Sequence, residues 1–167
     1  MKIALAGQGA FGVKHLEAVA KIEGIQVASL AGGNAAQTQE VAKKFNIPHW
    51  TLDLAESLEQ PGVEAVLLAT PTQMHARQAE QCMRAGKHVM IEIPIADNLA
   101  DSERLLKVQK ETGVIAMGGH TRRFNPSHQW IHQRIRSGEL KIQQMDVQTY
   151  FFQIGRASCR ERVLELV

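Results

Sequence analysis

The chain has 167 residues, of which 44% are hydrophobic and 22% are charged, and its formal net charge is +2. These values are typical of a compact globular domain with a full core. Lys and Arg do not concentrate in any segment, and no apolar stretch approaches the roughly 20 residues that span a bilayer, so we expect neither a nucleic-acid partner nor a membrane partner.

Short apolar segments alternate with segments of helical periodicity up to Gly119. Each apolar segment is bounded by turn residues, as is typical of a buried parallel strand. The predicted strands are Lys2–Ala6, Ile25–Leu30, Ala65–Ala69, His88–Ile91 and Val114–Met117. The predicted helices are Phe11–Ile22, Ala35–Phe45, Gln73–Ala85 (capped by Thr72 and ended by Gly86) and Leu99–Glu111. This order predicts the α/β fold class, with a Rossmann-type open parallel sheet and helices on both faces.

The pattern changes after Gly119. Residues Pro126–Ser137 predict a helix that follows an Asn-Pro step and stops at Gly138. Residues Ile142–Phe152 alternate between apolar and polar side chains, which is typical of a strand with two different faces. We therefore expect a first domain over residues 1–121 and the truncated start of an α/β C-terminal domain over residues 122–152.

A glycine motif directly follows the first predicted strand and opens the first helix. It is a G-x-G-x-x-G formed by Gly7, Gly9 and Gly12, with Ala10 and Phe11 at the start of the helix. Gly7 permits the tight turn, Gly9 lets the backbone approach a pyrophosphate, and Gly12 allows close helix–strand packing. The helix N-terminus presents free N–H groups to the phosphates. An ordinary glycine turn is the alternative, but the flanking elements favour a dinucleotide site.

The turn after the second predicted strand indicates which dinucleotide binds. An NAD site usually has an Asp or Glu there, about 20 residues after the glycine motif, to hold the ribose 2′-hydroxyl. Here the turn contains Gly33 and Asn34, without an acid that would repel a 2′-phosphate and without an Arg that would attract one. The turn favours NADP, with NAD as the alternative.

Two further motifs follow predicted strands, and they are Thr70-Pro71-Thr72-Gln73-Met74-His75 and Glu92-Ile93-Pro94. With the glycine motif, they resemble the glucose–fructose oxidoreductase, inositol dehydrogenase and rhizopine-catabolism (Gfo/Idh/MocA) family, over Met1 to about Phe152. The resemblance implies a Rossmann domain followed by an α/β domain for substrate and oligomerisation. It also implies that the cofactor lies beside Thr70, Pro71, Thr72, His75, Glu92 and Pro94.

One residue departs from the family pattern. The family usually has a Lys between Glu92 and Pro94, whereas this chain has Ile93. A Lys beside the nicotinamide can donate a hydrogen bond or relay a proton, and an Ile can do neither. The resemblance implies that this Ile marks a subgroup of the family.

The segments His120–Trp130 and Gln143–Phe152 are similar to one branch of the family. That branch uses NADP to oxidise a carboxylated cyclic hemiacetal during the breakdown of an aromatic compound. In the family the catalytic base, usually a His with an Asp, comes from the C-terminal domain, and the intact enzymes form homo-oligomers. Two alternatives stay open, namely a sugar or polyol dehydrogenase of the same family and a dinucleotide-binding module without catalysis.

Three polar residues follow the last predicted strand, where an open sheet places its ligand crevice. Arg122 and Arg123 are candidates for binding the carboxylates of a small-molecule substrate, because guanidinium groups bind carboxylates bidentately. His120 faces the same crevice if the topology is correct. A surface ion pair or a joint between domains is the alternative for each Arg, and the family resemblance favours Arg122 over Arg123 for substrate.

Neither the cysteines nor the remaining histidines predict a metal site. His128 and His132 are four residues apart on a predicted helix, but no third ligand is evident. Cys82 and Cys159 have no spacing typical of a disulfide framework or a metal site. Since Met1–Ala6 also lacks the length and the cleavage site of a signal peptide, we expect a cytoplasmic protein.

The last residues, 153–167, do not continue the preceding pattern. Residues Ile154–Val163 resemble one reading frame of a common sequencing adapter, residue by residue. We therefore expect a non-native tail, and a native gene that continues past Phe152 into a substrate domain. A natural, divergent C-terminus is the alternative.

These expectations predict that the chain binds a dinucleotide and does not turn over substrate. The physical reason is that the family supplies the catalytic His and Asp from the C-terminal domain. Mixing the purified chain with NADP and the carboxylated hemiacetal should give no absorbance from NADPH, the reduced cofactor that turnover would form. Clear turnover would contradict the truncation.

Overall fold

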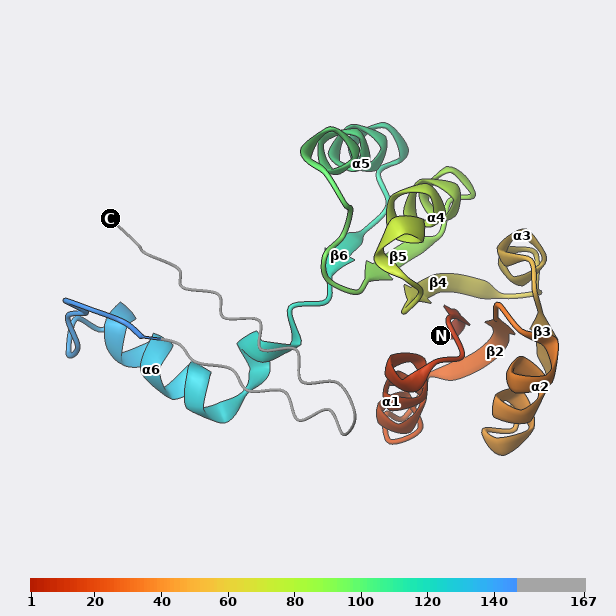
Figure 1. Ribbon diagram of the computed structural model, residues 1–167, viewed down its shortest axis with the longest axis horizontal. Helices are drawn as coiled ribbons and strands as arrows, with labels where there is room; N and C mark the ends of the chain where they lie inside the picture. Colours follow the sequence, from red (N-terminus) through yellow and green to blue (C-terminus); the bar gives the residue numbers. More distant parts are fainter. Residues whose placement is uncertain (147–167) are drawn as a thin grey trace, which may run out of the picture. The chain divides into compact units, whose positions relative to one another are not determined.

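A computed structural model describes residues 1–146 and divides the chain into two compact units. The first unit is Met1–His120, and the second begins at Thr121. Figure 1 shows the first unit as a sheet with helices on both of its faces. No helix in the described part of the chain is long and apolar enough to cross a membrane.

The sheet of the first unit has six strands in the order β3-β2-β1-β4-β5-β6, and every neighbouring pair is parallel. The strands are β1 (Lys2–Ala6), β2 (Gln26–Ala31), β3 (His49–Thr51), β4 (Val63–Leu68), β5 (His88–Ile91) and β6 (Ala116–Gly118). The strand order reverses between β1 and β4, which creates a crevice at the carboxyl ends of the strands. The structure confirms the predicted fold class.

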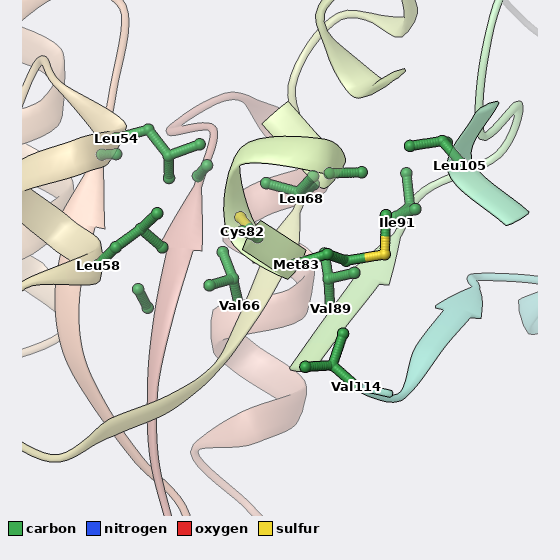
Figure 2. Packing of buried hydrophobic residues seen from close by; sticks show 14 of the residues in the cluster. Leu54, Leu58, Val66, Leu68, Cys82, Met83, Val89, Ile91, Leu105 and Val114 are labelled. Atoms are coloured by element: carbon green, nitrogen blue, oxygen red, sulfur yellow. The ribbon is translucent and has the colours of Figure 1, made fainter. Parts of the chain in front are cut away.

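Two helices cover one face of the sheet and three cover the other (Figure 1). The first group is α1 (Ala10–Val19) and α2 (Ala35–Lys44), and the second is α3 (Leu54–Leu58), α4 (Thr72–Arg84) and α5 (Leu99–Thr112). Alternate side chains of β5 point to opposite faces of the sheet. Val89 and Ile91 join the core under α4 and α5 (Figure 2), and Met90 packs on the core under α1.

The sequence pattern locates most of these elements within a few residues. The β1 and β5 boundaries agree with the prediction, and Gly113 ends α5 in the left-handed conformation with φ +69°. The prediction that Thr72 caps α4 is wrong. Thr72 is the first helical residue, Pro71 stands at the cap position, and no side chain caps this helix.

The pattern also missed β3 and α3. These elements have three and five residues, too few for a strand or helix periodicity to emerge. The strand β3 forms because it pairs with β2, with Ser29 opposite His49. The short helix α3 is started by Asp53, whose side chain accepts a hydrogen bond from the N–H of Ala55.

The second unit contains a 3-10 turn, η1 (Thr121–Phe124), and the helix α6 (Pro126–Arg136). Asn125 caps α6 by accepting a hydrogen bond from the N–H of Ser127 at 3.0 Å. The predicted strand Ile142–Phe152 does not form over residues 142–146, and residues 147–152 lie outside the described part of the chain, as does the predicted tail.

An ion-pair group joins α4 to α5. The carboxylate of Glu80 accepts hydrogen bonds from Arg84 Nε at 2.8 Å and from Arg104 Nε at 3.0 Å. The hydrogen bond from Arg84, aided by that from Arg104, holds the pKa of Glu80 below its ordinary value. A carboxyl whose pKa is lower in the folded state stabilises the fold above its unfolded pKa, and this contribution is lost as the pH falls through the folded pKa.

We predict that Glu80→Gln lowers the free energy of unfolding at pH 7 by less than about 1 kcal/mol, because the group is partly exposed. Urea unfolding at pH 7 and at about pH 3, below the ordinary pKa of Glu, measures the difference, which should shrink at the lower pH. Glu103→Gln on α5 is the matched control, since Glu103 forms no ion pair within residues 1–146. A pH-independent loss would contradict the ion-pair origin.

Candidate functional site

The glycine turn between β1 and α1 lies at the carboxyl edge of the sheet, against the end of β4. Gly7 has φ +111°, a conformation that L side chains rarely adopt. Its N–H donates to the carbonyl oxygen of Ala31 at 2.8 Å, which ties the turn to the end of β2. A Cβ on Gly7 would lie 2.4 Å from the carbonyl oxygen of Ala69, so only glycine fits here.

The other two glycines of the motif have opposite surroundings. A Cβ on Gly12 would lie 1.7 Å from the carbonyl oxygen of Gly7, so glycine at this position allows α1 to pack on the turn. A Cβ on Gly9 would meet no atom within 4 Å. Gly12 therefore serves the packing of the fold, and Gly9 leaves its backbone open to a ligand.

The N-terminus of α1 suits an anion. Gly9 is the cap residue of this helix and offers no side chain to its first N–H groups, and the first turn contains no acidic residue. The N–H groups and the positive end of the helix dipole therefore stay available for a phosphate. Phe11, whose exposed fraction is 70%, and Ala10 flank this backbone on the surface.

The turn between β2 and α2 is joined to the glycine turn by one side chain. The N–H of Gly33 donates to Gln8 Oε1 at 2.9 Å, so the two turns hold each other. Asn34 caps α2 by accepting from the N–H of Gln37 at 3.0 Å. The first turn of α2 contains no acidic residue, so no carboxylate there opposes a second phosphate.

The turn between β4 and α4 is held from inside by two residues of α4. His75 is 2% exposed, and its Nε2 lies 2.7 Å from the carbonyl oxygen of Thr70, at the start of the turn. The Thr70 hydroxyl donates to Oε1 of the buried Gln78. The other ring nitrogen, Nδ1, lies 2.7 Å from the carbonyl oxygen of Pro94. The protein itself therefore engages both ring nitrogens of His75.

Glu92, directly after β5, pairs with a histidine of α1 that the sequence analysis missed. His15 Nε2, on α1, lies 2.7 Å from Glu92 Oε1, and the two side chains are 14% and 12% exposed. Glu92 is a predicted site residue, but His15 was not singled out. The signal that identifies it is its position three residues after Gly12, beside the buried Leu16 on the inner face of α1.

The end of β6 completes this edge of the sheet. A Cβ on Gly119 would lie 3.3 Å from Glu92 Oε1, so the missing side chain leaves room for that carboxylate. His120 follows and is exposed. Arg122 and Arg123 are also exposed, and they belong to η1 in the second unit.

The described residues provide neither a metal-binding cluster nor a reactive thiol. No three His, Cys, Asp or Glu side chains within residues 1–146 are placed to hold a metal ion. Burial raises the pKa of the Cys82 thiol to about 12, so the thiol is protonated at neutral pH and packs as a small apolar side chain (Figure 2).

Two family profiles match the chain. The profile described as "Oxidoreductase family, NAD-binding Rossmann fold" matches residues 1–120, and that described as "Bacterial oxidoreductases, C-terminal" matches residues 126–162. The second match extends past Phe152, where the sequence analysis expects the native residues to end. The residues concerned lie outside the part that the structure describes, and the tail stays a prediction.

Individual relatives are dehydrogenases. The chain is 58% identical over 152 residues to the 4-carboxy-2-hydroxymuconate-6-semialdehyde dehydrogenase of Sphingobium sp. (strain NBRC 103272 / SYK-6), covering 91% of this chain and 48% of that protein. It is 31% identical over 141 residues to the scyllo-inositol 2-dehydrogenase (NAD(+)) of Bacillus subtilis (strain 168), covering 84% of this chain and 41% of that protein.

A solved structure agrees with these matches. The crystal structure of scyllo-inositol dehydrogenase from Lactobacillus casei with bound NAD(H) and scyllo-inositol has a TM-score of 0.79 and 25% identity to this chain. The match covers 83% of this chain and 42% of that one. The chain thus spans about half, or somewhat less, of the length of the relatives that it matches.

The different surroundings of Gly9 and Gly12 give a matched pair of variants. Gly12→Ala should lower the midpoint of thermal unfolding by several degrees, since its Cβ would overlap the Gly7 carbonyl and the backbone must move. Gly9→Ala should leave the midpoint unchanged and weaken NADPH binding about tenfold or more, because the methyl group stands where a phosphate approaches. Thermal unfolding and fluorescence titration measure the two effects. Equal destabilisation by both variants would contradict the assignment.

Proposed function

Since the chain belongs to the oxidoreductase family with an NAD-binding Rossmann fold, we propose that its first unit binds NADP for an NADP-dependent dehydrogenase. The proposed reaction is the oxidation of the hemiacetal of 4-carboxy-2-hydroxymuconate 6-semialdehyde to 2-pyrone-4,6-dicarboxylate. The single observation that carries this choice is the 58% identity to a relative named for that semialdehyde. The inositol dehydrogenase of Bacillus subtilis is 31% identical, which makes a sugar or polyol substrate the second candidate.

The first unit offers the features that a dinucleotide requires. The open backbone at Gly9 and the uncapped N-terminus of α1 suit the pyrophosphate. The ends of β2 and α2, at Gly33 and Asn34, border the adenosine half, and the ends of β4, β5 and β6 border the nicotinamide half. We assign Thr70, Pro71, Thr72, Glu92 and Pro94 to direct contact with the nicotinamide half. His75 holds the two segments that contain these residues, through the carbonyl oxygens of Thr70 and Pro94.

The choice of NADP rests on the turn after β2. A carboxylate at this turn binds the 2′-hydroxyl of NAD and repels the 2′-phosphate of NADP. Gly33 and Asn34 carry no charge, and α2 adds no acid in its first turn. The adenosine end is therefore compatible with the extra phosphate.

The chemistry of oxidation divides between cofactor and protein. A bound nicotinamide ring accepts a hydride from the hemiacetal carbon. The protein must orient that carbon, hold the substrate carboxylates and remove the hydroxyl proton. We assign the carboxylates to Arg122, with Arg123 and His120 nearby in sequence, because guanidinium groups bind carboxylates bidentately. We assign removal of the proton to a His and an Asp that lie beyond the described residues, because the family resemblance implies such a pair.

Cofactor choice is tested by fluorescence titration of the chain with NADPH and NADH. NADPH should bind more tightly than NADH, because the turn after β2 has no carboxylate that would repel the 2′-phosphate and bind the 2′-hydroxyl of NADH. Asn34→Asp places a carboxylate at the end of β2 and should reverse the preference. Asn98→Asp is the control, since Asn98 caps α5 in the same way. Tighter binding of NADH by the unmodified chain would overturn the NADP proposal.

Substrate choice is tested on the protein encoded by the complete gene. Purified protein is assayed with NADP and with either the hemiacetal or scyllo-inositol, following absorbance of the reduced ring. We expect kcat/KM for the hemiacetal to exceed that for scyllo-inositol by at least about a hundredfold, because an uncharged polyol has no carboxylate for the Arg side chains to bind. A preference for scyllo-inositol would establish the second candidate instead.

A further inference from the structure

We propose that His15 and His75 are positioning residues that hold the Glu92-Ile93-Pro94 turn from the two faces of the sheet and so present Ile93 to the nicotinamide half of the dinucleotide. This inference rests on the proposed dinucleotide binding and deepens it. We name the two residues together the histidine clamp.

The first contact of the histidine clamp comes from the α1 face. Glu92 follows Met90 in the alternation of β5, and Met90 packs on the core under α1. The Glu92 side chain therefore points to that face, where His15 Nε2 donates to its Oε1 at 2.7 Å. The second oxygen, Oε2, accepts from the N–H of Ile93 at 3.2 Å. One carboxylate thus connects α1 to the backbone of the turn.

The second contact of the clamp comes from the α4 face, opposite α1 (Figure 1). His75 Nδ1 lies 2.7 Å from the carbonyl oxygen of Pro94, and Nε2 lies 2.7 Å from that of Thr70. A carbonyl oxygen only accepts, so a neutral ring donates to one of them and a protonated ring to both. In either form the ring fills the space between the two segments that follow β4 and β5.

Between these contacts stands an apolar side chain that belongs to neither core cluster. Ile93 is 44% exposed, although it lies between two residues that the protein holds on both sides. The chain therefore fixes the backbone of the turn while leaving this apolar side chain at the open edge of the sheet. Such an arrangement sets the position of a contact surface for a ligand ring, as second-layer hydrogen bonds do for other ligand-contacting groups.

The neighbours of the Glu92 carboxylate leave it little room to change its position. A Cβ on Gly119 would lie 3.3 Å from Glu92 Oε1 and 3.2 Å from Met90 Cε. The carboxylate therefore occupies a space bounded by α1 on one side and by the end of β6 on the other. Its side chain is only 12% exposed, so loss of the His15 donor leaves a nearly buried carboxylate without that partner.

The test compares whole dinucleotides with their adenosine halves. The 167-residue chain is titrated by calorimetry with NADPH and 2′,5′-ADP, and with NADH and ADP, so that either cofactor preference gives a usable pair. His15→Leu should weaken binding of the preferred whole dinucleotide about tenfold, the size expected for losing a hydrogen bond to a charged group. It should leave the affinity for the matching adenosine half unchanged. A general loss of structure would weaken both ligands.

Two variants and one control complete the design. His15→Gln retains an N–H donor for Glu92 and should restore most of the affinity for the whole dinucleotide. His75→Gln keeps one donor, removes the bridge between Thr70 and Pro94, and should show the same split between whole and half ligand. Lys14→Gln, on the exposed side of α1, should change neither affinity. If His75→Gln does not fold, the comparison of His15→Leu with His15→Gln still tests the clamp.

A methyl NMR signal gives a second readout. In the unmodified chain the δ1 methyl of Ile93 should shift on addition of the preferred dinucleotide in its oxidised form, NADP or NAD, because the aromatic nicotinamide ring then lies beside it, and should not shift with the adenosine half. In His15→Leu this shift should fall by more than half. Equal effects of His15→Leu on both ligands, or an unchanged Ile93 shift, would overturn the clamp. If none of the four ligands binds, the proposed function is overturned, and the clamp with it.

Discussion

The site depends on one close approach between two backbone segments. The helix α1 packs so tightly on the turn before it that a Cβ on Gly12 would lie 1.7 Å from the Gly7 carbonyl oxygen. This contact places the N-terminus of α1 directly after β1, at the point where the strand order reverses. Because the same turn abuts the end of β4 at Ala69, the two halves of the sheet meet there without intervening side chains.

Along the carboxyl edge of the sheet, three side chains reach from one segment to another and add to the backbone hydrogen bonds between the strand ends. Gln8 connects the turns after β1 and β2, His75 connects those after β4 and β5, and His15 connects α1 to Glu92. Each contact joins segments that are far apart in the chain. The edge therefore behaves as one connected rim, and a ligand that spans the crevice meets turns whose relative positions the protein itself maintains.

The two histidines illustrate why a lone polar residue is hard to interpret from sequence. His75 was expected beside the cofactor because of the Thr-Pro motif that precedes it, and the structure shows it buried with both ring nitrogens against backbone carbonyls. The motif lies at the carboxyl edge of the sheet, and the His75 ring is buried behind the surface of that edge. His15 has no motif of its own apart from its spacing to Gly12.

Local sequence determined the alternation of strands and helices, the glycine turn and the parallel sheet class, since these depend on apolar periodicity and on backbone conformations that only glycine adopts. It also determined the family, through motifs that are contiguous in the chain. Tertiary structure alone decided the rest: the short strand β3 needs its partner β2, and the Glu92–His15 contact joins residues 77 positions apart. Nothing local encodes such a pairing, because it exists only after α1 has packed on the face of the sheet to which the Glu92 side chain points.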